Sequence, residues 1–338
     1  MIKKKVSLKT IAEHCGLAAT TVSRILNGKS TYCSEAKILQ VREIAREWDY
    51  HPHIGYSIMT GKQTNIAGII FSQPRATYDD RNNRLYMRLT TGLNNLNFTA
   101  YTIIMDGGRE EQLKKIMDLD ERGCRYYIFI GNPLYGEAGY EYLAGLNRCM
   151  TGFNNLFLPR NVSCDHLGTF LRYYRLAREE GRRFFRFVLP ADMFFNRFLN
   201  TLSADDRSEI KNCFFLPEVD RSITDPCDRQ FASGHDSMIK LLQQDPGCDA
   251  ACFYTDYHAL GAAAALKELG IAPDKVRLFG LGDYTVSRFT ETRFTTARFD
   301  MEHIGDLILE NFTGHEPLNR SIPGKIIEYP NNKGDFEK

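Results

Sequence analysis

The feature that most constrains the fold is an alternation of short apolar segments with longer helical ones along most of the chain. Apolar runs predict strands at residues 65–73, 100–105, 125–131, 184–189, 213–216, 250–255 and 277–281. Stretches between or after them predict helices at residues 84–97, 110–122, 166–180, 228–244, 257–269 and 301–313. Strands that alternate with helices form parallel sheets with helices on both faces. The pattern therefore predicts an α/β fold.

The length of the alternating region predicts two lobes. The chain has 338 residues, of which 338 − 62 = 276 follow residue 62. That is large for one doubly wound parallel sheet, so two such lobes with a ligand cleft between them are expected. No apolar run approaches the roughly 18 residues of a membrane helix. The basic start MIKKKVSLKT also lacks the apolar segment of a signal peptide, so we expect a cytoplasmic protein with no membrane partner.

The cysteines and histidines do not form a recognisable metal motif. Nine cysteines without a Cys-x-x-Cys pair are typical of free thiols in a reducing compartment. Cys248 and Cys252 are four residues apart, but Cys252 lies in an apolar run that predicts a buried strand. His51 and His53 have no further ligands nearby in the sequence. Neither pair completes the tetrahedral ligand set of zinc, so no metal and no cofactor are expected.

Motifs of the common enzyme classes are missing from the sequence. It holds no Walker A loop, no Gly-x-Ser-x-Gly and no His-Glu-x-x-His. Residues 280–282 begin like a dinucleotide-binding fingerprint, but Thr285 stands where its third glycine belongs. We therefore assign no catalytic residue and do not expect an enzyme. Carboxylates such as Asp165, Asp256 and Asp283 keep an enzyme on the same body open as an alternative.

Charge is balanced over the whole chain, at +1, but it is unevenly placed. Residues 1–62 hold ten Lys or Arg and five Asp or Glu, which is 10 − 5 = +5. The remainder holds 33 basic and 37 acidic residues, which is −4. A small basic segment on a mildly acidic body indicates a polyanionic partner for that segment.

The basic segment has the apolar periodicity of three short helices. Ser7 is expected to cap the first helix, and Gly16 is expected to end it in a left-handed conformation. A second helix is expected at about 18–26 and a third after Ser34. The spacing Ala-x3-Gly-x5-Val, which begins at Ala12, is that of a helix-turn-helix. The second helix of such a motif enters the DNA major groove.

Several motifs resemble the lactose-repressor (LacI/GalR) family. Near the N-terminus these are VSLKTIAEHCGLAATTVSRILNGKS, WDYHP and TGKQTNIAGIIF. Later in the chain they are TDYHALGAAAALKELGI (255–271), VRLFGLGDY (276–284) and RFTTARFDMEHIGDLILENFTG (293–314). The resemblance covers nearly the whole chain, with a weaker match at residues 124–164.

The resemblance implies a division of the chain into three parts. These are a helix-turn-helix head at residues 1–50, a hinge linker at 51–63, and a ligand-binding and dimerisation body at 64–338. The body of this family resembles periplasmic sugar-binding proteins. Lobe 1 is expected at about 64–161 and 297–322, and lobe 2 at about 162–296 and 323–338.

The resemblance also assigns DNA contacts in the head. Base contacts fall on Ala19, Thr20 and Arg24. Arg24 is suited to guanine O6 and N7, and Ala19 is suited to a thymine methyl group. A phosphate contact stays the alternative for Arg24. Phosphate contacts are expected of four further polar residues, Lys9, Thr21, Ser23 and Asn27.

In the hinge linker, the resemblance implies minor-groove contacts. The family has a helix there that forms on DNA and inserts leucines between bases. Here Met59 stands at the leucine position, and an apolar methionine suits such a wedge. Tyr56 stands where the family has alanine. Both are therefore expected to lie in the minor groove.

For the cleft, the resemblance names candidate ligand-binding residues. Arg197 aligns with the family's ligand-binding arginine, with a surface ion pair as the alternative. Tyr86 lies in a segment where the family has cleft aromatics. Asp256, Asp283 and Phe299 fall at or beside further cleft positions. Gly282 departs from the family, which has a ligand-binding aspartate there.

Together these patterns predict a sequence-specific DNA-binding transcription regulator, a repressor, that acts as a homodimer on operator DNA. A small ligand in the cleft, a sugar or sugar derivative by default, is expected to change operator affinity allosterically. A solute-binding protein and an enzyme on the same two-lobed body are the alternatives. Inducer versus co-repressor, and dimer versus tetramer, stay open.

Overall fold

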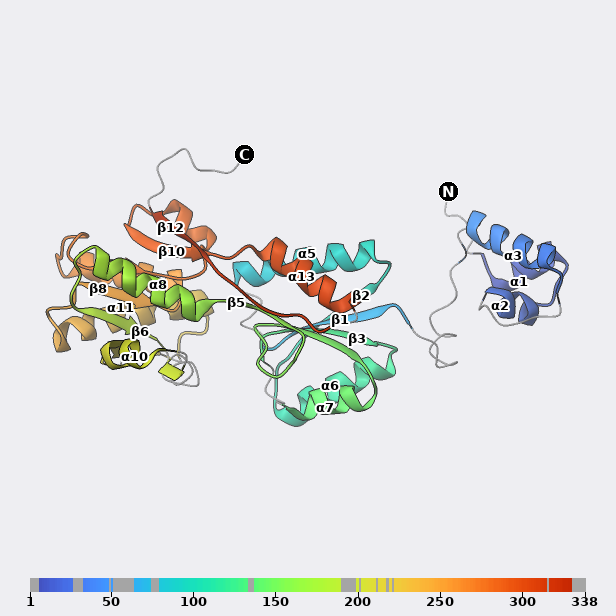
Figure 1. Ribbon diagram of the computed structural model, residues 1–338, viewed down its shortest axis with the longest axis horizontal. Helices are drawn as coiled ribbons and strands as arrows, with labels where there is room; N and C mark the ends of the chain where they lie inside the picture. Colours follow the sequence, from blue (N-terminus) through green and yellow to red (C-terminus); the bar gives the residue numbers. More distant parts are fainter. Residues whose placement is uncertain are drawn as a thin grey trace. The chain divides into compact units, whose positions relative to one another are not determined.

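The computed structural model describes residues 6–26, 33–48, 50, 64–73, 79–132, 137–189, 199–200, 202–210, 212–216, 219–220, 222–314 and 316–329. The chain divides into two compact units, Met1–Thr64 and Asn65–Lys338, called here the head and the body (Figure 1). Among the described helices, none is long and apolar enough to cross a membrane. All nine cysteines lie in the described ranges and are free thiols.

The described part of the head is a bundle of α1 (Leu8–Cys15), α2 (Ala19–Leu26) and α3 (Glu35–Glu47). Ser7 caps α1 by accepting the backbone N–H of Thr10, and Gly16 ends it at φ 65°, as the sequence predicted. The Lys37 ammonium donates to the last carbonyl of α1, Cys15 O, at 2.8 Å. The apolar core of the bundle consists of Ile11, Ala12, Cys15, Val22, Ile25, Val41, Ile44 and Ala45.

Lobe 1 of the body is built on a sheet with the strand order β11-β5-β4-β3-β1-β2, and its described pairs are all parallel. Its strands are β1 (Ile66–Phe71), β2 (Thr99–Ile104), β3 (Tyr126–Ile130), β4 (Cys149–Phe153), β5 (Asn161–Cys164) and β11 (Asn319–Ile322). Its helices are α5 (Asp80–Asn95), α6 (Arg109–Glu121), α7 (Glu137–Gly145) and α13 (Met301–Thr313).

Helices cover both faces of this sheet. In Figure 1, α5 and α13 lie side by side on one face, and α6 and α7 lie on the other. Because successive strand residues point to opposite faces, Ile66 and Ile70 of β1 pack with Ile116 of α6. Ile69 of β1 packs with Leu89 of α5. This two-sided burial explains why β1 is apolar at every position.

Lobe 2 is built on a sheet with the order β12-β10-β9-β8-β6-β7. Its strands are β6 (Phe185–Val188), β7 (Phe214–Phe215), β8 (Ala250–Phe253), β9 (Arg277–Phe279), β10 (Phe294–Arg298) and β12 (Lys325–Tyr329). Its helical elements are α8 (His166–Glu179), α10 (Ala204–Ile210), α11 (Pro226–Gln244), α12 (Asp256–Glu268) and the 3₁₀ turn η2 (Thr285–Phe289). Edge strand β12 runs antiparallel to β10, and the other described pairs are parallel.

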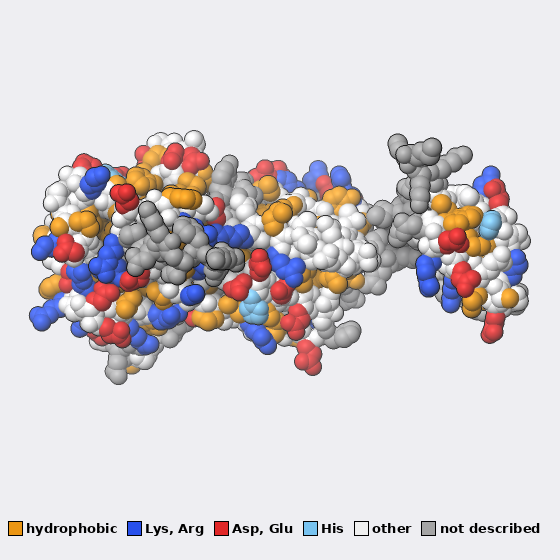
Figure 2. All heavy atoms as spheres, turned by 90° about the horizontal axis from the view of Figure 1, so that it is seen from above, with side chains coloured by type: hydrophobic (Ala, Val, Ile, Leu, Met, Phe, Trp, Pro, Cys, Tyr) orange, Lys and Arg blue, Asp and Glu red, His pale blue; other side chains and the backbone are white. Residues whose placement is uncertain are grey.

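The chain passes between the lobes at three places in its described part, from β5 to α8, from β10 to α13 and from β11 to β12. Residues 161–162, where the first passage was expected, lie inside β5, and residues 296–297 lie inside β10. The first and third passages run close together: Asp165 N–H donates to Ile322 O at 2.8 Å, and Arg172 donates to Gly324 O at 2.8 Å. On the face of the body seen in Figure 2, side chains of both charge signs are interspersed, in keeping with its small net charge.

Candidate DNA-binding helix and interlobe site

The second helix of the head presents one polar face to solvent. Val22 and Ile25 are buried in the bundle, which turns the opposite side of α2 outward. Thr20 and Arg24 are exposed on that side, and Ala19 is exposed in the first turn of the helix. Thr20 and Arg24 are four residues apart, so their side chains lie one turn apart on the same face. A buried apolar stripe therefore fixes which residues this helix presents.

In the body, the carboxyl ends of the two sheets meet across a set of polar contacts. Asp79 caps α5 in lobe 1 by accepting the backbone N–H groups of Arg81 at 2.9 Å and Asn82 at 3.4 Å. The Arg81 guanidinium lies against the same carboxylate, with Nε 3.1 Å from Oδ1 and Nη2 2.7 Å from Oδ2. The pair is a two-point charge-assisted contact, which holds the guanidinium in one orientation.

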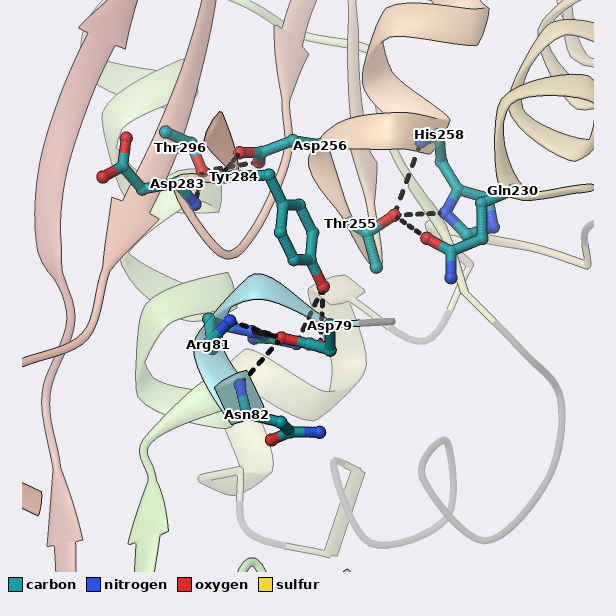
Figure 3. Close-up of polar contacts among 10 residues, drawn as sticks. All are labelled: Asp79, Arg81, Asn82, Gln230, Thr255, Asp256, His258, Asp283, Tyr284 and Thr296. Atoms are coloured by element: carbon teal, nitrogen blue, oxygen red, sulfur yellow. Dashed lines mark hydrogen bonds and ion pairs between the residues drawn. The ribbon is translucent and has the colours of Figure 1, made fainter. Parts of the chain in front are cut away.

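Tyr284 of lobe 2 reaches this pair, as Figure 3 shows. Its hydroxyl donates to Asp79 Oδ2 at 2.8 Å and accepts from Arg81 Nη2 at 3.1 Å. The guanidinium carbon of Arg81 lies 5.3 Å from the centre of the Tyr284 ring. Beside it, Thr285 N–H donates to Asp80 Oδ2 at 2.8 Å. These contacts join the lobes at the carboxyl ends of their sheets, where ligands of doubly wound folds bind.

Burial and charge act in opposite directions on these groups. Burial alone would raise the pKa of Asp79, but the Arg81 charge and the hydrogen bonds from Arg81 and Tyr284 hold it below its usual value. Burial is the main reason that the pKa of Tyr284 is far above its usual value. Asp79 is therefore a carboxylate and Tyr284 a neutral phenol across the ordinary pH range.

The turn that carries Tyr284 is fixed by hydrogen bonds to Asp256, the first residue of α12. The fully buried Asp256 carboxylate accepts Tyr284 N–H at 2.9 Å, Ser287 Oγ at 2.7 Å and Thr296 Oγ1 at 2.6 Å. Burial raises the pKa of Asp256 to about 6, although these hydrogen bonds oppose the shift. Gly282, at φ 124°, supplies a backbone conformation that other residues rarely adopt.

His166, the first residue of α8, lies near the same junction. Its ring packs edge-on against Phe299, with centroids 5.4 Å apart, and against Tyr254 at 6.2 Å. Its Nε2 atom is inaccessible to solvent and has no hydrogen-bond partner among the described residues. Burial, assisted by the positive charge of Arg81, lowers the pKa of His166 to about 3. The junction thus holds a neutral imidazole with an unused polar atom.

Comparisons with known proteins agree for both units. Residues 7–53 match the family of bacterial regulatory proteins called the lacI family, and residues 218–315 match a periplasmic binding protein-like domain. The transcriptional regulator GalR of Escherichia coli K12 is 22% identical over 310 residues, which cover 87% of this chain and 84% of GalR. The regulator MalR of Streptococcus pneumoniae serotype 4 is 31% identical over 65 residues, 19% of this chain and 20% of MalR.

Solved structures show the same fold. The lac repressor dimer bound to operator and an anti-inducer superposes with a TM-score of 0.65 at 16% identity, covering 96% of this chain and 98% of that chain. The complex of the regulator CelR with cellobiose gives 0.64 at 17% identity, covering 95% and 98%. The chain belongs to the LacI/GalR family. It is a DNA-binding transcription regulator.

In this LacI/GalR member, two predicted ligand residues are engaged inside lobe 2. Asp283 is fully buried, and its carboxylate accepts from Arg298 Nε at 2.6 Å and from the Tyr329 hydroxyl at 2.5 Å. Figure 3 shows it turned away from Asp79 and Arg81. Asp256 accepts hydrogen bonds from the turn that carries Tyr284. Both carboxylates are therefore engaged inside lobe 2, and a direct ligand contact by either one stays a prediction.

The other predicted residues are placed differently. Phe299 lies at the junction, against His166. The Tyr86 ring packs on Phe71, and its hydroxyl lies 3.0 Å from Thr102 Oγ1 of β2. Among the phosphate candidates, Thr21 and Ser23 are half-buried, and Lys9 is exposed and paired with Glu13. Arg197, Asn27, Tyr56 and Met59 lie outside the described residues.

Sequence reasoning missed four residues that the fold brings to the junction, namely Asp79, Arg81, His166 and Tyr284. Two of them were detectable in part, because Asp79 is a residue type that caps helices and Tyr284 follows a predicted strand within a few residues, whereas His166 follows β5, which leaves no apolar run in the sequence. In parallel sheets such positions gather at one edge. No pattern in the sequence marks Arg81, whose partner Asp79 lies only two residues away.

Proposed function

We propose that this LacI/GalR member is a sequence-specific repressor whose operator affinity is controlled by a small ligand bound between the two lobes. The observation that carries DNA recognition is the surface of α2, where Ala19, Thr20 and Arg24 are exposed while Val22 and Ile25 are buried. A short helix with this arrangement offers its N-terminal residues to base edges in the major groove. Lys9, Thr21, Ser23 and Asn27 are proposed phosphate contacts, and Tyr56 and Met59 proposed minor-groove contacts.

The ligand part of the proposal is supported by the interlobe junction. Polar groups from both lobes converge there, and the two lobes are joined by only a few chain passages. A ligand that contacts both lobes changes the population of their arrangements if it binds one arrangement better. A sugar or sugar derivative is the proposed class, since CelR is described in complex with cellobiose. Arg197 remains a proposed ligand contact.

We propose further that the regulator is a cytoplasmic homodimer without enzymatic activity. The lac repressor is described as a dimer bound to operator, and two heads suit two half-sites of a near-palindrome. The relatives are transcription regulators, which favours this reading over an enzyme. A protein that only captures solutes has no use for a basic helix-turn-helix.

The test is genomic footprinting with the purified full-length chain, followed by fluorescence anisotropy on the recovered sequence. We expect protected sites with two related half-sites, nanomolar affinity at physiological salt, and a change in affinity when a sugar from a thermal-shift screen is added. Protection without sequence preference would refute sequence-specific regulation. Substrate turnover in the screen would instead support an enzyme.

A further inference from the structure

The Tyr284 hydroxyl lies at the interlobe junction, in a position that suits only certain chemical groups. Its hydroxyl donates one hydrogen bond to a carboxylate, Asp79, and accepts one from a guanidinium, Arg81. A group that satisfies both partners at once must be a donor and an acceptor on the same atom. A neutral hydroxyl has both capacities, whereas a carboxylate or phosphate oxygen only accepts and an ammonium only donates.

The charge around this position favours a neutral group. The single positive charge of Arg81 is already matched by Asp79 through two contacts. Asp80 adds a second carboxylate beside it, which accepts Thr285 N–H. An incoming anion would therefore face two carboxylates and one guanidinium that is already paired.

The surroundings agree with a ligand that carries several hydroxyl groups. The positive charge of Arg81 contributes to the lowered pKa of His166. The buried Nε2 atom of His166 lacks a partner among the described residues. A neutral imidazole nitrogen pairs with a hydroxyl in either tautomer. The half-buried ring of Tyr254 packs on the same histidine and is of the kind that stacks on a sugar ring, whereas the Phe299 ring is buried.

We propose that Asp79 and Arg81 form a hydroxyl-binding subsite of the effector cleft, that Tyr284 occupies it in the ligand-free chain, and that it selects neutral polyhydroxylated effectors over anionic ones. This inference rests on the proposed function of the cleft. It implies competition, because the Tyr284 hydroxyl and an effector hydroxyl need the same two partners.

Three variants of the full chain separate these roles. Tyr284→Phe keeps the ring, which packs 5.3 Å from the Tyr257 ring, and removes only the competing hydroxyl. Asp79→Asn keeps a helix-capping side chain but leaves Arg81 without its counter-charge. Tyr257→Phe is the matched control, since it removes a neighbouring tyrosine hydroxyl whose partner is Cys227 in the same lobe.

The experiment is calorimetric titration of these proteins with neutral probes (D-ribose, D-galactose, cellobiose) and their anionic counterparts (D-ribose 5-phosphate, D-galacturonate, cellobionate). We expect a neutral probe to bind the parent, to bind Tyr284→Phe about tenfold more tightly, and to bind Asp79→Asn at least about tenfold more weakly. Tyr257→Phe should match the parent within about twofold. Thermal unfolding of each variant shows that it is folded.

Three outcomes would overturn the subsite. These are binding of anionic probes only, unchanged neutral-probe affinity in both Tyr284→Phe and Asp79→Asn, and no binding of any neutral probe to the parent and Tyr284→Phe. Operator anisotropy in the presence of each probe separates this failure from that of the proposed function. An anionic probe that binds and shifts operator affinity leaves ligand control standing, whereas probes that bind without shifting it refute ligand control and leave the subsite intact.

Discussion

At the scale of single residues, two aspartates of the body show how partners decide the state of a buried carboxyl group. Asp79 faces a guanidinium, and its pKa lies below the usual value. Asp256 faces hydroxyl and backbone N–H donors, which are neutral, and burial raises its pKa to about 6. Neutral donors do not fully offset the loss of hydration, whereas a paired cation does so at Asp79.

The raised pKa of Asp256 predicts a pH-dependent contribution to stability. A group with a higher pKa in the folded state than in the unfolded state stabilises the fold most below the unfolded pKa of about 3.8. That contribution is lost as the pH rises through about 6. Relative to Asp256→Asn, the parent should lose unfolding free energy between pH 4.5 and 6.5, with a slope of up to about 1.4 kcal/mol per pH unit.

Urea unfolding of both proteins at several pH values measures this difference, and the Asn variant serves as the non-titrating reference. A difference that is constant from pH 4.5 to 7.5 would show that Asp256 does not titrate in this range. A parent that gains unfolding free energy relative to Asp256→Asn as the pH rises from 4.5 to 6.5 would contradict a raised folded pKa.

Arg24 carries the prediction for base recognition. Arg24→Ala should weaken operator binding by roughly 1–3 kcal/mol and relax the preference at one base pair of each half-site, since a bidentate contact to guanine is lost. Anisotropy on the operator and on single-base variants measures both effects. Equal weakening on every sequence would instead assign Arg24 to a phosphate.

At the scale of elements, two helices of lobe 2 cross with their backbones in contact. A Cβ atom added to Gly234 of α11 would lie 2.0 Å from His258 O of α12. A Cβ atom added to Gly261 of α12 would lie 2.0 Å from Phe231 O of α11. Each glycine thus accommodates the other helix, and the helices pack closer than larger side chains would permit.

This crossing predicts a large effect from a small substitution. Gly234→Ala should destabilise the body by about 1–3 kcal/mol, because the backbone carbonyl of His258 must move. Gly145→Ala, at the end of α7, is the matched control, since its Cβ would meet no atom of the described residues within 4 Å. Denaturant unfolding should show the control unchanged or slightly more stable. Equal effects of both substitutions would contradict close helix packing as the cause.

At the scale of the whole molecule, the uneven charge and the proposed dimer together predict a steep salt dependence. Each neutralised phosphate adds about −0.9 to the slope of log affinity against log salt. A dimer with both heads on DNA should therefore show a slope on a full operator about twice that on DNA with one half-site. It should also bind the full operator far more tightly, because joined heads act at high effective concentration. Equal slopes and affinities on the two DNAs would rule out two-headed binding.

The sequence by itself determined the features that arise within a few neighbouring residues. The cap at Ser7, the end of α1 at Gly16 and the inward Val22 follow from local chemistry and the helical period. Alternating apolar runs likewise predicted the lobes. The sequence did not predict strands such as β5 and β11. These strands are short and carry polar residues, so they leave no apolar run to detect.

Only the tertiary structure decided which side chains meet at the junction. Tyr284 lies 205 residues from Asp79 in the chain, and no local pattern specifies their contact. Asp283 has positive φ, at 50°, in a turn that sends its carboxylate into lobe 2 and the next side chain across to lobe 1. Asp283 thus forms contacts inside lobe 2, whereas Tyr284, the next residue, forms contacts with lobe 1. Periodicity reports which face of an element is buried, whereas long-range packing and backbone direction decide the partner of each side chain.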